Sequence, residues 1–183
     1  MSAPRRFLFL LASTREGGNS EAMARRAASF LPPEYEIWWV PLVNHPLPRF
    51  EDTRHSTGFG EPEGEAKVLA EATLWATDLV IVTPVYWYSL PAGAKLYFDH
   101  WSAWMRSPSL DFRARMKGRN LWAVVADSDQ EQEGSAEPLL DSLRRTADFM
   151  GMAFAGALVG HGSKPGEALA DPALGAMAEA FFQ

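Results

Sequence analysis

The sequence predicts an α/β protein built on one open sheet of parallel strands. Five short apolar segments recur along the 183 residues. Three of these segments are almost continuously hydrophobic, which is typical of parallel strands that helices cover on both faces. Segments with a helical spacing of apolar residues lie between them, so strands and helices alternate. No internal repeat or long linker interrupts the pattern, and we therefore expect residues 1–183 to form a single domain.

Each element of this alternation has its own signal. The expected strands are the apolar segments Phe7–Ala12, Tyr35–Val40, Leu79–Thr83, Leu121–Ala126 and Met152–Val159. The expected helices, which carry apolar residues three and four positions apart, are Ser20–Leu31, Glu65–Ala76, Pro91–Met105, Gly134–Met150 and a last segment after Pro172. The Pro32-Pro33 pair ends the first helix, and Gly151 ends the fourth.

The least regular stretch is Pro41–Gly64, which contains four prolines and two histidines. A loop of this length is unusual in a compact domain. We therefore expect it to be either functional or poorly ordered.

Composition excludes several classes of protein. The chain has 17 basic and 23 acidic residues, a net charge of −6, which argues against a nucleic-acid partner because phosphate neutralisation needs a basic surface. The absence of cysteine excludes disulfides, thiolate-bound clusters and a cysteine nucleophile, and no metal site is predicted. No apolar run approaches the roughly 20 residues of a membrane span, and the first apolar segment is too short for a secretion signal. We expect a cytoplasmic protein that does not enter membranes.

The loop after the first strand has the composition of an anion-binding site. Ser13, Thr14 and Ser20 can each donate a hydroxyl hydrogen bond, and Arg15 can meet a phosphate through two N–H groups. A helix follows directly, and its free backbone N–H groups and positive dipole end favour an anion. The loop therefore predicts phosphate binding at the carboxyl end of the first strand.

The same loop has a plainer interpretation as a helix cap. Asn19 or Ser20 would then be the N-cap, with Gly17 and Gly18 as ordinary turn residues. Motifs of other nucleotide-binding and hydrolytic folds are missing: there is no G-x-G-x-x-G, no G-x-x-x-x-G-K-[ST] and no G-x-S-x-G. Strand one also lacks the acidic residues at its end that a phospho-acceptor receiver domain would need.

A second informative loop follows the third strand and contains three consecutive aromatic residues, Tyr86, Trp87 and Tyr88. In an open sheet of order 2-1-3-4-5, strands one and three flank the point where the ligand crevice opens. A phosphate loop beside a flat aromatic wall suits a molecule such as FMN. Taken alone, the aromatic run is equally consistent with core packing or a surface patch.

In these motifs the chain resembles the flavodoxin-like NAD(P)H-dependent FMN reductases and their quinone- and azo-reducing relatives. The matching segments span nearly the whole chain: Ser13-x-Arg15-x-x-x-Asn19-Ser20, Thr83-Pro84-Val85-Tyr86-Trp87-Tyr88-Ser89-x-Pro91, and Gly151-Met152 with Gly160-x-Gly162-x-x-Pro165-Gly166-Glu167. The resemblance implies a flavodoxin-like fold, a five-stranded parallel sheet with FMN at its carboxyl edge. The cofactor-binding residues expected on this basis are Ser13, Arg15, Gly18, Asn19, Ser20, Pro84, Val85, Tyr86, Trp87 and Ser89.

The chain departs from the family pattern after strand four. The family commonly has glycines where this sequence reads Asp127-Ser128-Asp129. Two carboxylates beside FMN would disfavour a reduced, anionic flavin. Alternatively, Ser128 or Asp129 simply caps a turn into the acidic stretch Glu131–Glu133.

The resemblance implies an FMN-dependent oxidoreductase that passes electrons from NAD(P)H through FMN to a small acceptor by a ping-pong hydride mechanism. The acceptor would be a quinone, an azo compound or a flavin. No catalytic acid or base is expected, because the flavin carries the reaction; the four histidines are interpreted as structural or solvated, and His161 is the best placed of them to touch substrate. Two alternatives stay open: a non-enzymatic flavin-binding electron carrier or sensor, which Arg15 argues against, and a fold relative that has lost the cofactor.

The helix that begins at Pro91 carries more aromatic surface than one sheet contact would bury. Exposed aromatic patches mark interfaces, so we expect Trp101 and Trp104 to contribute to a homodimer or homotetramer. The alternative is that both tryptophans belong to the core.

Overall fold

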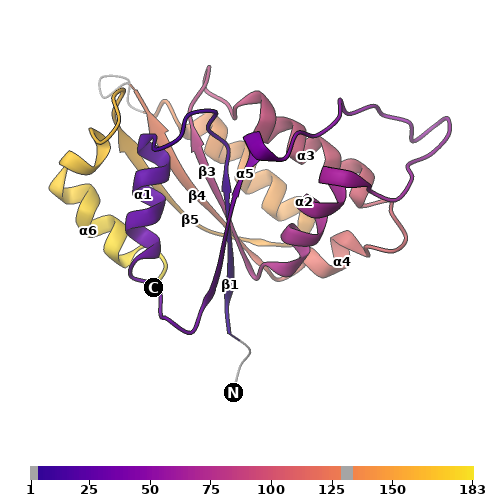
Figure 1. The fold of residues 1–183 in the computed structure, drawn as a ribbon, viewed down its shortest axis with the longest axis horizontal. Coiled ribbons are helices and arrows are strands. Elements are labelled where there is room, and N and C mark those ends of the chain that lie inside the picture. The colour runs from indigo at the N-terminus through magenta and orange to yellow at the C-terminus, as the bar shows by residue number, and fades with distance from the viewer. Residues whose placement is uncertain (1–3, 129–133) are drawn as a thin grey trace.

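The computed structural model describes residues 4–128 and 134–183. Its centre is a five-stranded, all-parallel sheet of order β2-β1-β3-β4-β5, which confirms the predicted fold class (Figure 1). The strands are β1 (Arg6–Leu11), β2 (Glu36–Pro41), β3 (Asp78–Pro84), β4 (Asn120–Asp127) and β5 (Ala153–His161). They run upward in Figure 1, so their carboxyl ends meet at the upper edge of the sheet.

Helices cover both faces of the sheet, and the strand residues alternate between two buried clusters. Helices α1 (Asn19–Ala28) and α6 (Pro172–Ala180) lie over the face to which Phe7 and Phe9 point. Leu8 and Leu10 point to the opposite face. That face is covered by α2 (Gly64–Trp75), α3 (Ala92–Trp104), α4 (Phe112–Met116) and α5 (Glu137–Met150). Within residues 4–128 and 134–183, no helix combines the length and the apolar character that a membrane crossing requires.

The sequence did not predict three short helical segments: α4 and the 3-10 turns η1 (Leu42–Asn44) and η2 (Ala168–Ala170). A segment of three to five residues is too short to show a helical period in the sequence. Helix α1 also ends at Ala28 rather than at Leu31. A proline at position 32 pushes the residue before it out of the helical region, so the helix closes earlier.

The expectation that Trp101 and Trp104 form an exposed surface is wrong. Their exposed fractions are 3% and 1%. Both indoles pack edge-on against Phe112 of α4, with ring centroids 5.2 and 5.5 Å apart. The unpredicted helix α4 covers the aromatic side of α3, and the two tryptophans therefore belong to the core.

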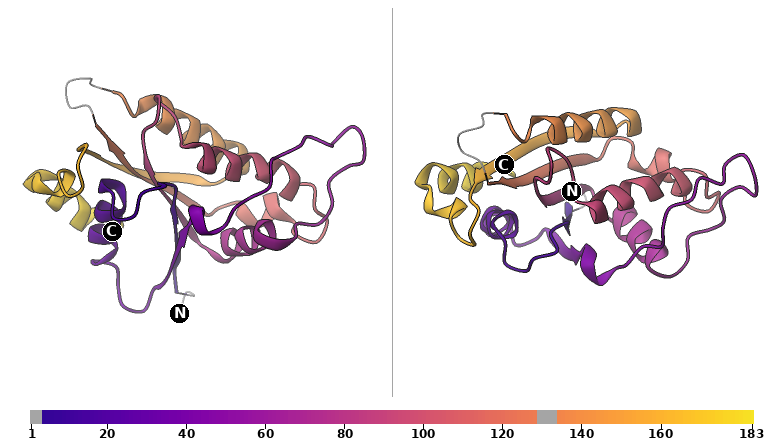
Figure 2. Two further views of the ribbon diagram at one scale, coloured as in Figure 1. Left: turned by 45° about the horizontal axis from the view of Figure 1, so that its top comes forward. Right: turned by 90° about the horizontal axis from the view of Figure 1, so that it is seen from above.

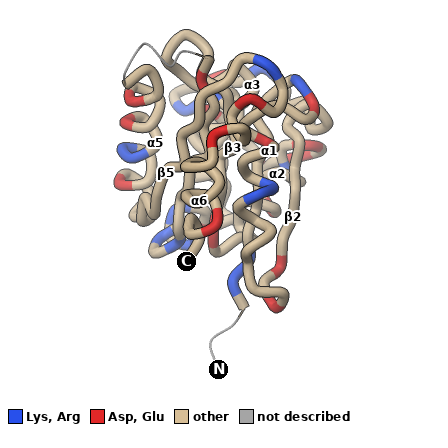
Figure 3. The backbone as a smooth tube through the Cα atoms, turned by 90° about the vertical axis from the view of Figure 1, so that its left-hand side faces the viewer, with Lys and Arg blue, Asp and Glu red and all other residues tan. Residues whose placement is uncertain are grey.

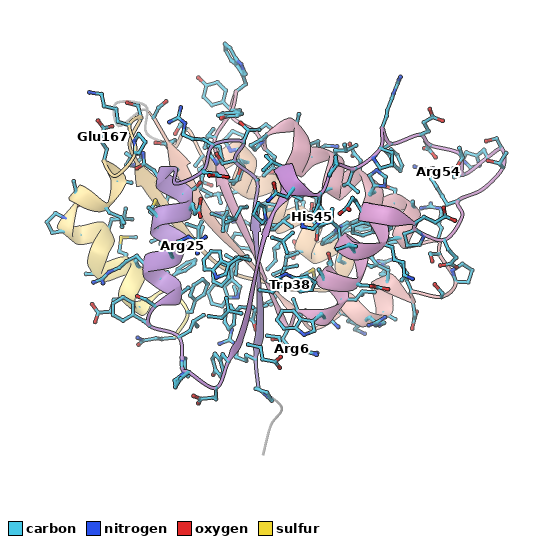
Figure 4. All side chains as sticks on the ribbon, in the orientation of Figure 1. Arg6, Arg25, Trp38, His45, Arg54 and Glu167 are labelled. Atoms are coloured by element: carbon cyan, nitrogen blue, oxygen red, sulfur yellow. The ribbon has the colours of Figure 1, made fainter. Side chains whose placement is uncertain are left out.

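The long loop between η1 and α2 projects beyond the body of the protein, and its base is attached to the end of α3 (Figures 1 and 2). The ring of His100 donates a hydrogen bond from Nε2 to the carbonyl oxygen of Pro48, at 2.9 Å. The carboxylate of Glu61 accepts hydrogen bonds from the hydroxyls of Ser107 and Ser109. Arg54 lies near the tip of the projection (Figure 4).

Charges of both signs are interspersed on the helices. Along α5, one basic segment lies among acidic ones (Figure 3). Asp141 and Arg145 form an ion pair one turn apart, with the Nε and Oδ2 atoms separated by 2.7 Å. No continuous basic stripe is visible on the face that Figure 3 shows.

A buried carboxylate, Asp78, fastens the amino-terminal edge of the sheet. It accepts hydrogen bonds from the guanidinium of Arg5, from Thr77 Oγ1 at 2.7 Å, from Asn120 Nδ2 at 2.8 Å and from Trp122 Nε1 at 3.0 Å. Burial by itself raises the pKa of Asp78, but these hydrogen bonds, led by that of Arg5, outweigh burial and hold the pKa below its ordinary value.

We expect Asp78→Asn to lower the free energy of unfolding by about 2 kcal/mol at pH 7, because it removes a charged acceptor and unpairs Arg5. The folded-state pKa of Asp78 lies below the unfolded one, so its contribution is complete above the unfolded pKa and is lost as pH falls below about 4. Urea unfolding from pH 7 to pH 3.5 should show the gap between variant and wild type narrowing. Asp52→Asn, on the projecting loop, should leave stability nearly unchanged; a gap that stays constant with pH would contradict the expectation.

Candidate cofactor and active site at the carboxyl edge of the sheet

A cleft of about 260 Å³ opens at the carboxyl edge of the sheet. Its walls come from the loops after β1, β3, β4 and β5, which the parallel topology brings to one edge. From the loop after β1 the cleft takes Ser13, Arg15, Gly18, Asn19 and Ser20. The fold thus brings these five predicted residues, all from one loop, together with cleft residues that are distant in sequence.

The loop after β3 supplies the facing wall. Of the residues predicted there, Pro84, Val85 and Tyr86 line the cleft, whereas Trp87 and Ser89 lie outside the lining. A backbone hydrogen bond from Val85 N–H to the carbonyl oxygen of Ala126, at 2.9 Å, ties this wall to β4.

The loop after β1 presents an unsatisfied helix end. Gly18 is the N-cap of α1 and no side chain caps the helix, so the alternative in which Asn19 or Ser20 caps it is wrong. The first N–H groups of a helix have no partner within it, and here they begin at the cleft. In the part of the chain that the structure describes, the guanidinium of Arg15 has no hydrogen-bond or ion-pair partner. The loop therefore offers backbone donors and one free cation to an anion.

The side chain of Asn19 makes all of its hydrogen bonds to the loop after β5. Its Nδ2 donates to the carbonyl oxygens of Gly162 and Lys164, at 2.8 and 2.9 Å. Its Oδ1 accepts from the N–H groups of Gly166 and Ala168, at 2.9 and 3.4 Å. The amide thus fastens the loop after β5 to the loop after β1, and only the backbone N–H of Asn19 remains for a ligand.

Close packing makes glycine necessary beside this amide. A Cβ atom on Gly162 would lie 2.8 Å from Nδ2 of Asn19 and 2.9 Å from the backbone nitrogen of Ala168. The loop is closed further by Glu167, at the upper edge in Figure 4, which accepts from the N–H groups of Lys164 and Ser163, both at 2.9 Å. These bonds, Lys164 first, hold the pKa of the Glu167 carboxyl below its usual value.

The aromatic turn carries backbone strain. Tyr86 and Ser89 exchange backbone hydrogen bonds of 3.0 and 3.1 Å across a two-residue turn. Trp87 and Tyr88 at its tip have φ angles of 51° and 61°, a left-handed conformation that costs non-glycine residues about 1–2 kcal/mol each. Trp87 is 93% exposed, so core packing does not account for it. Strain retained at an exposed aromatic residue beside a cleft indicates a functional turn.

Sequence reasoning missed a polar contact between the ends of β4 and β5. Asp127 and His161 are paired in register, and the carboxylate of Asp127 contacts Nδ1 of His161 and the hydroxyl of Ser135. Asp127 is therefore not a free charge facing a cofactor, whereas Asp129 lies outside the described residues. The available signal was that Asp127 directly follows the expected strand four and His161 comes two residues after the expected strand five. These two strands are neighbours in the predicted sheet order.

The arrangement suits a ligand with an anionic group at one end and a planar group at the other. The helix end and Arg15 can hold the anion, and the turn at Pro84–Tyr86 can hold the planar part. Within the described residues, no group of three or more His, Asp or Glu side chains could hold a metal ion.

Comparison with known proteins agrees with this geometry. A family model described as a flavodoxin-like fold matches residues 5–183. A Bacillus subtilis protein with the provisional name NAD(P)H-dependent FMN-containing oxidoreductase YwqN is 30% identical over 160 residues, 86% of each chain. An Escherichia coli K12 protein named quinone reductase is 32% identical over 100 residues, 54% of this chain and 51% of its own. The solved structure of a Trp repressor binding protein from Bacillus subtilis superposes with a TM-score of 0.76 at 24% identity, covering 97% of each chain.

The strain in the turn can be measured with two substitutions that both remove the indole. We expect Trp87→Gly to be more stable than Trp87→Ala by about 1 kcal/mol, because only glycine adopts a φ of 51° without steric cost. Urea unfolding of the two variants measures this difference directly. Equal stability of the two would show that position 87 is not held in the left-handed region.

Proposed function

The chain belongs to the family of proteins with the flavodoxin-like fold, and from that premise we propose that it is an FMN-dependent oxidoreductase. It would pass electrons from NAD(P)H through bound FMN to a small acceptor. The observation that carries the proposal is the cleft in which an uncapped helix end and the unpaired Arg15 face an aromatic turn. The names of the Bacillus subtilis and Escherichia coli relatives support the cofactor, the donor and the reductase class.

The residues of the cleft fit FMN at both ends. The phosphate would accept hydrogen bonds from the backbone N–H groups of Gly18, Asn19 and Ser20, and from the hydroxyl of Ser13. Arg15 would add a charge-assisted hydrogen bond. The ring would lie along Pro84, Val85 and Tyr86, with Trp87 and Ser89 at its margin.

When bound, FMN would supply the hydride chemistry, taking two electrons from the nicotinamide and giving them to the acceptor. The protein binds and orients the reactants. We propose that donor and acceptor occupy the same open side of the cleft in turn, a ping-pong order, with a quinone, an azo compound or a free flavin as acceptor. We propose the cytoplasm as the protein's location, the compartment that the sequence led us to expect.

We also propose a homodimer through α3, the helix that the sequence suggested, but on the side of it that faces α5 and not through Trp104. Helices α3 and α5 flank a groove of about 340 Å³. Phe98 from α3 and Met105, which directly follows α3, lie half-buried in it, and Phe149 from α5 is 56% exposed. Partly exposed aromatic and methionine side chains of this kind are enriched at interfaces. A second copy of the chain would bury them.

We expect the purified protein to take up FMN, and Arg15→Ala to weaken binding about 10- to 100-fold, the effect of losing one hydrogen bond to a charged group. Titration of the apoprotein, followed by quenching of flavin fluorescence, measures this change. Arg54→Ala, a matched arginine on the projecting loop, should bind FMN like the wild type. Oxidation of NAD(P)H should then depend on an added quinone: a protein that takes up no FMN would refute the proposal, and bound flavin without turnover would favour the electron carrier.

The assembly can be tested with an exposed residue that the core does not need. Phe149→Glu places a charge in the α3–α5 groove and should convert the dimer to a monomer of 20.3 kDa. Light scattering gives the mass in solution. Met177→Glu, at a residue 52% exposed on α6, is the control and should remain dimeric. A wild-type monomer at micromolar concentration would contradict the proposal.

A further inference from the structure

The last residues of β4 and β5 form a polar pair beside the cleft. Asp127 and His161 are neighbours in register on adjacent parallel strands, so their side chains lie on the same face of the sheet. One carboxylate oxygen of Asp127 contacts Nδ1 of His161, and the other accepts a hydrogen bond from the hydroxyl of Ser135. The pair is held by regular strand geometry rather than by a flexible loop.

The two partners differ sharply in accessibility. The side chain of Asp127 is 4% exposed, and that of His161 is 43% exposed. A carboxylate is an acceptor only, so Nδ1 of His161 carries the proton that bonds to it. The second nitrogen, Nε2, has no hydrogen-bond partner among the described residues. The imidazole is therefore fixed on its inner side and free on its outer side.

His161 lies beside the cleft but is not itself among the residues that line it. Asp127, its partner in register, and Gly162, the next residue in the chain, both line the cleft. Gly162 N–H donates to the carbonyl oxygen of Asp127 at 2.8 Å, which fixes the backbone on either side of the histidine. His161 is thus anchored between two lining residues.

The other three histidines, all of them within the described residues, do not share this arrangement. His100 is buried and donates to a backbone carbonyl. His45 contacts the half-exposed carboxylate of Glu65 beside the projecting loop, with Nδ1 and Oε2 2.6 Å apart. His55 lies exposed on that loop. An exposed imidazole oriented by a buried carboxylate at the cleft is specific to His161.

We propose that His161 donates the proton that a quinone or azo acceptor needs, and that Asp127 is its positioning residue; this rests on the proposed function. A quinone that takes a hydride from the reduced cofactor at one oxygen is left with an electron pair on the other. Because Nδ1–H is held by Asp127, the donor is the imidazolium form of His161, which also carries a proton on Nε2. This N–H bond breaks, its electron pair stays on nitrogen to leave a neutral imidazole, and an O–H bond forms on the negatively charged acceptor oxygen. The product is the hydroquinone, and the exposed imidazole regains a proton from water. Asp127 keeps Nδ1–H inward, so that Nε2 is the nitrogen presented to the acceptor.

Two acceptors separate proton donation from other effects. Benzoquinone needs a proton as well as two electrons, whereas ferricyanide takes electrons without a proton. We expect His161→Gln to slow reoxidation of the reduced protein by benzoquinone about 100-fold, within the usual range for a general acid, and to leave reoxidation by ferricyanide unchanged. Asp127→Asn should show the same selectivity, and the double variant should be no slower than His161→Gln, because the two residues act as one unit. His55→Gln is the matched control and should behave as the wild type.

Two further measurements do not depend on turnover. Both variants should bind FMN with wild-type affinity in the fluorescence titration. Proton NMR of the apoprotein should show a low-field Nδ1–H signal that disappears in His161→Gln and in Asp127→Asn. Equal slowing with both acceptors, or no slowing with benzoquinone, would overturn the proton-donating role of His161 and leave the proposed function standing. A wild-type protein that takes up no FMN would overturn the proposed function and this role together.

Discussion

The side-chain amide of Asn19 is the interaction on which the cleft depends. Its four hydrogen bonds join the loop after the first strand to the loop after the last one, segments more than 140 residues apart in sequence. A buried amide that loses its partners costs about 1–3 kcal/mol, so the two loops are stable only together. With them come the uncapped end of α1 and the backbone around Gly162. The cleft therefore forms only when the two loops are joined, and neither loop forms it alone.

Two buried carboxylates, one at each edge of the sheet, have different hydrogen-bond partners and therefore different roles. Asp78 at the amino-terminal edge has a guanidinium and three further donors, which satisfy its charge inside the fold. Asp127 at the carboxyl edge has one hydroxyl and one imidazole. The first arrangement is closed to solvent and contributes stability. The second leads through the partly exposed imidazole of His161 to solvent beside the cleft, where proton exchange with water is possible.

The turn at Tyr86–Ser89 lowers the stability of the fold, because two of its residues have a strained backbone beside the cleft. Two consecutive residues are held with positive φ, and the exposed Trp87 gains nothing from the core. The surrounding sheet tolerates this strain because its strands are buried on both faces by two apolar clusters. Rigid strands and a strained connecting turn together present an aromatic surface at a defined place, as functional loops on parallel sheets generally do.

The sequence alone determined the alternation of strands and helices and the two loops that face each other, because hydrophobic runs, proline and glycine are local signals and parallel strands gather their carboxyl ends at one edge. The strand order followed from the resemblance to the flavodoxin-like reductases. The tertiary structure alone decided what individual side chains do. The side chain of Asn19 binds a distant loop; Trp104 was expected at a surface but lies under α4; and Asp127, which the sequence left open as a charge beside the cofactor, pairs with His161. In each case the partner is remote in sequence. Local periodicity carries no information about which remote group will arrive, since that follows from packing of the whole chain.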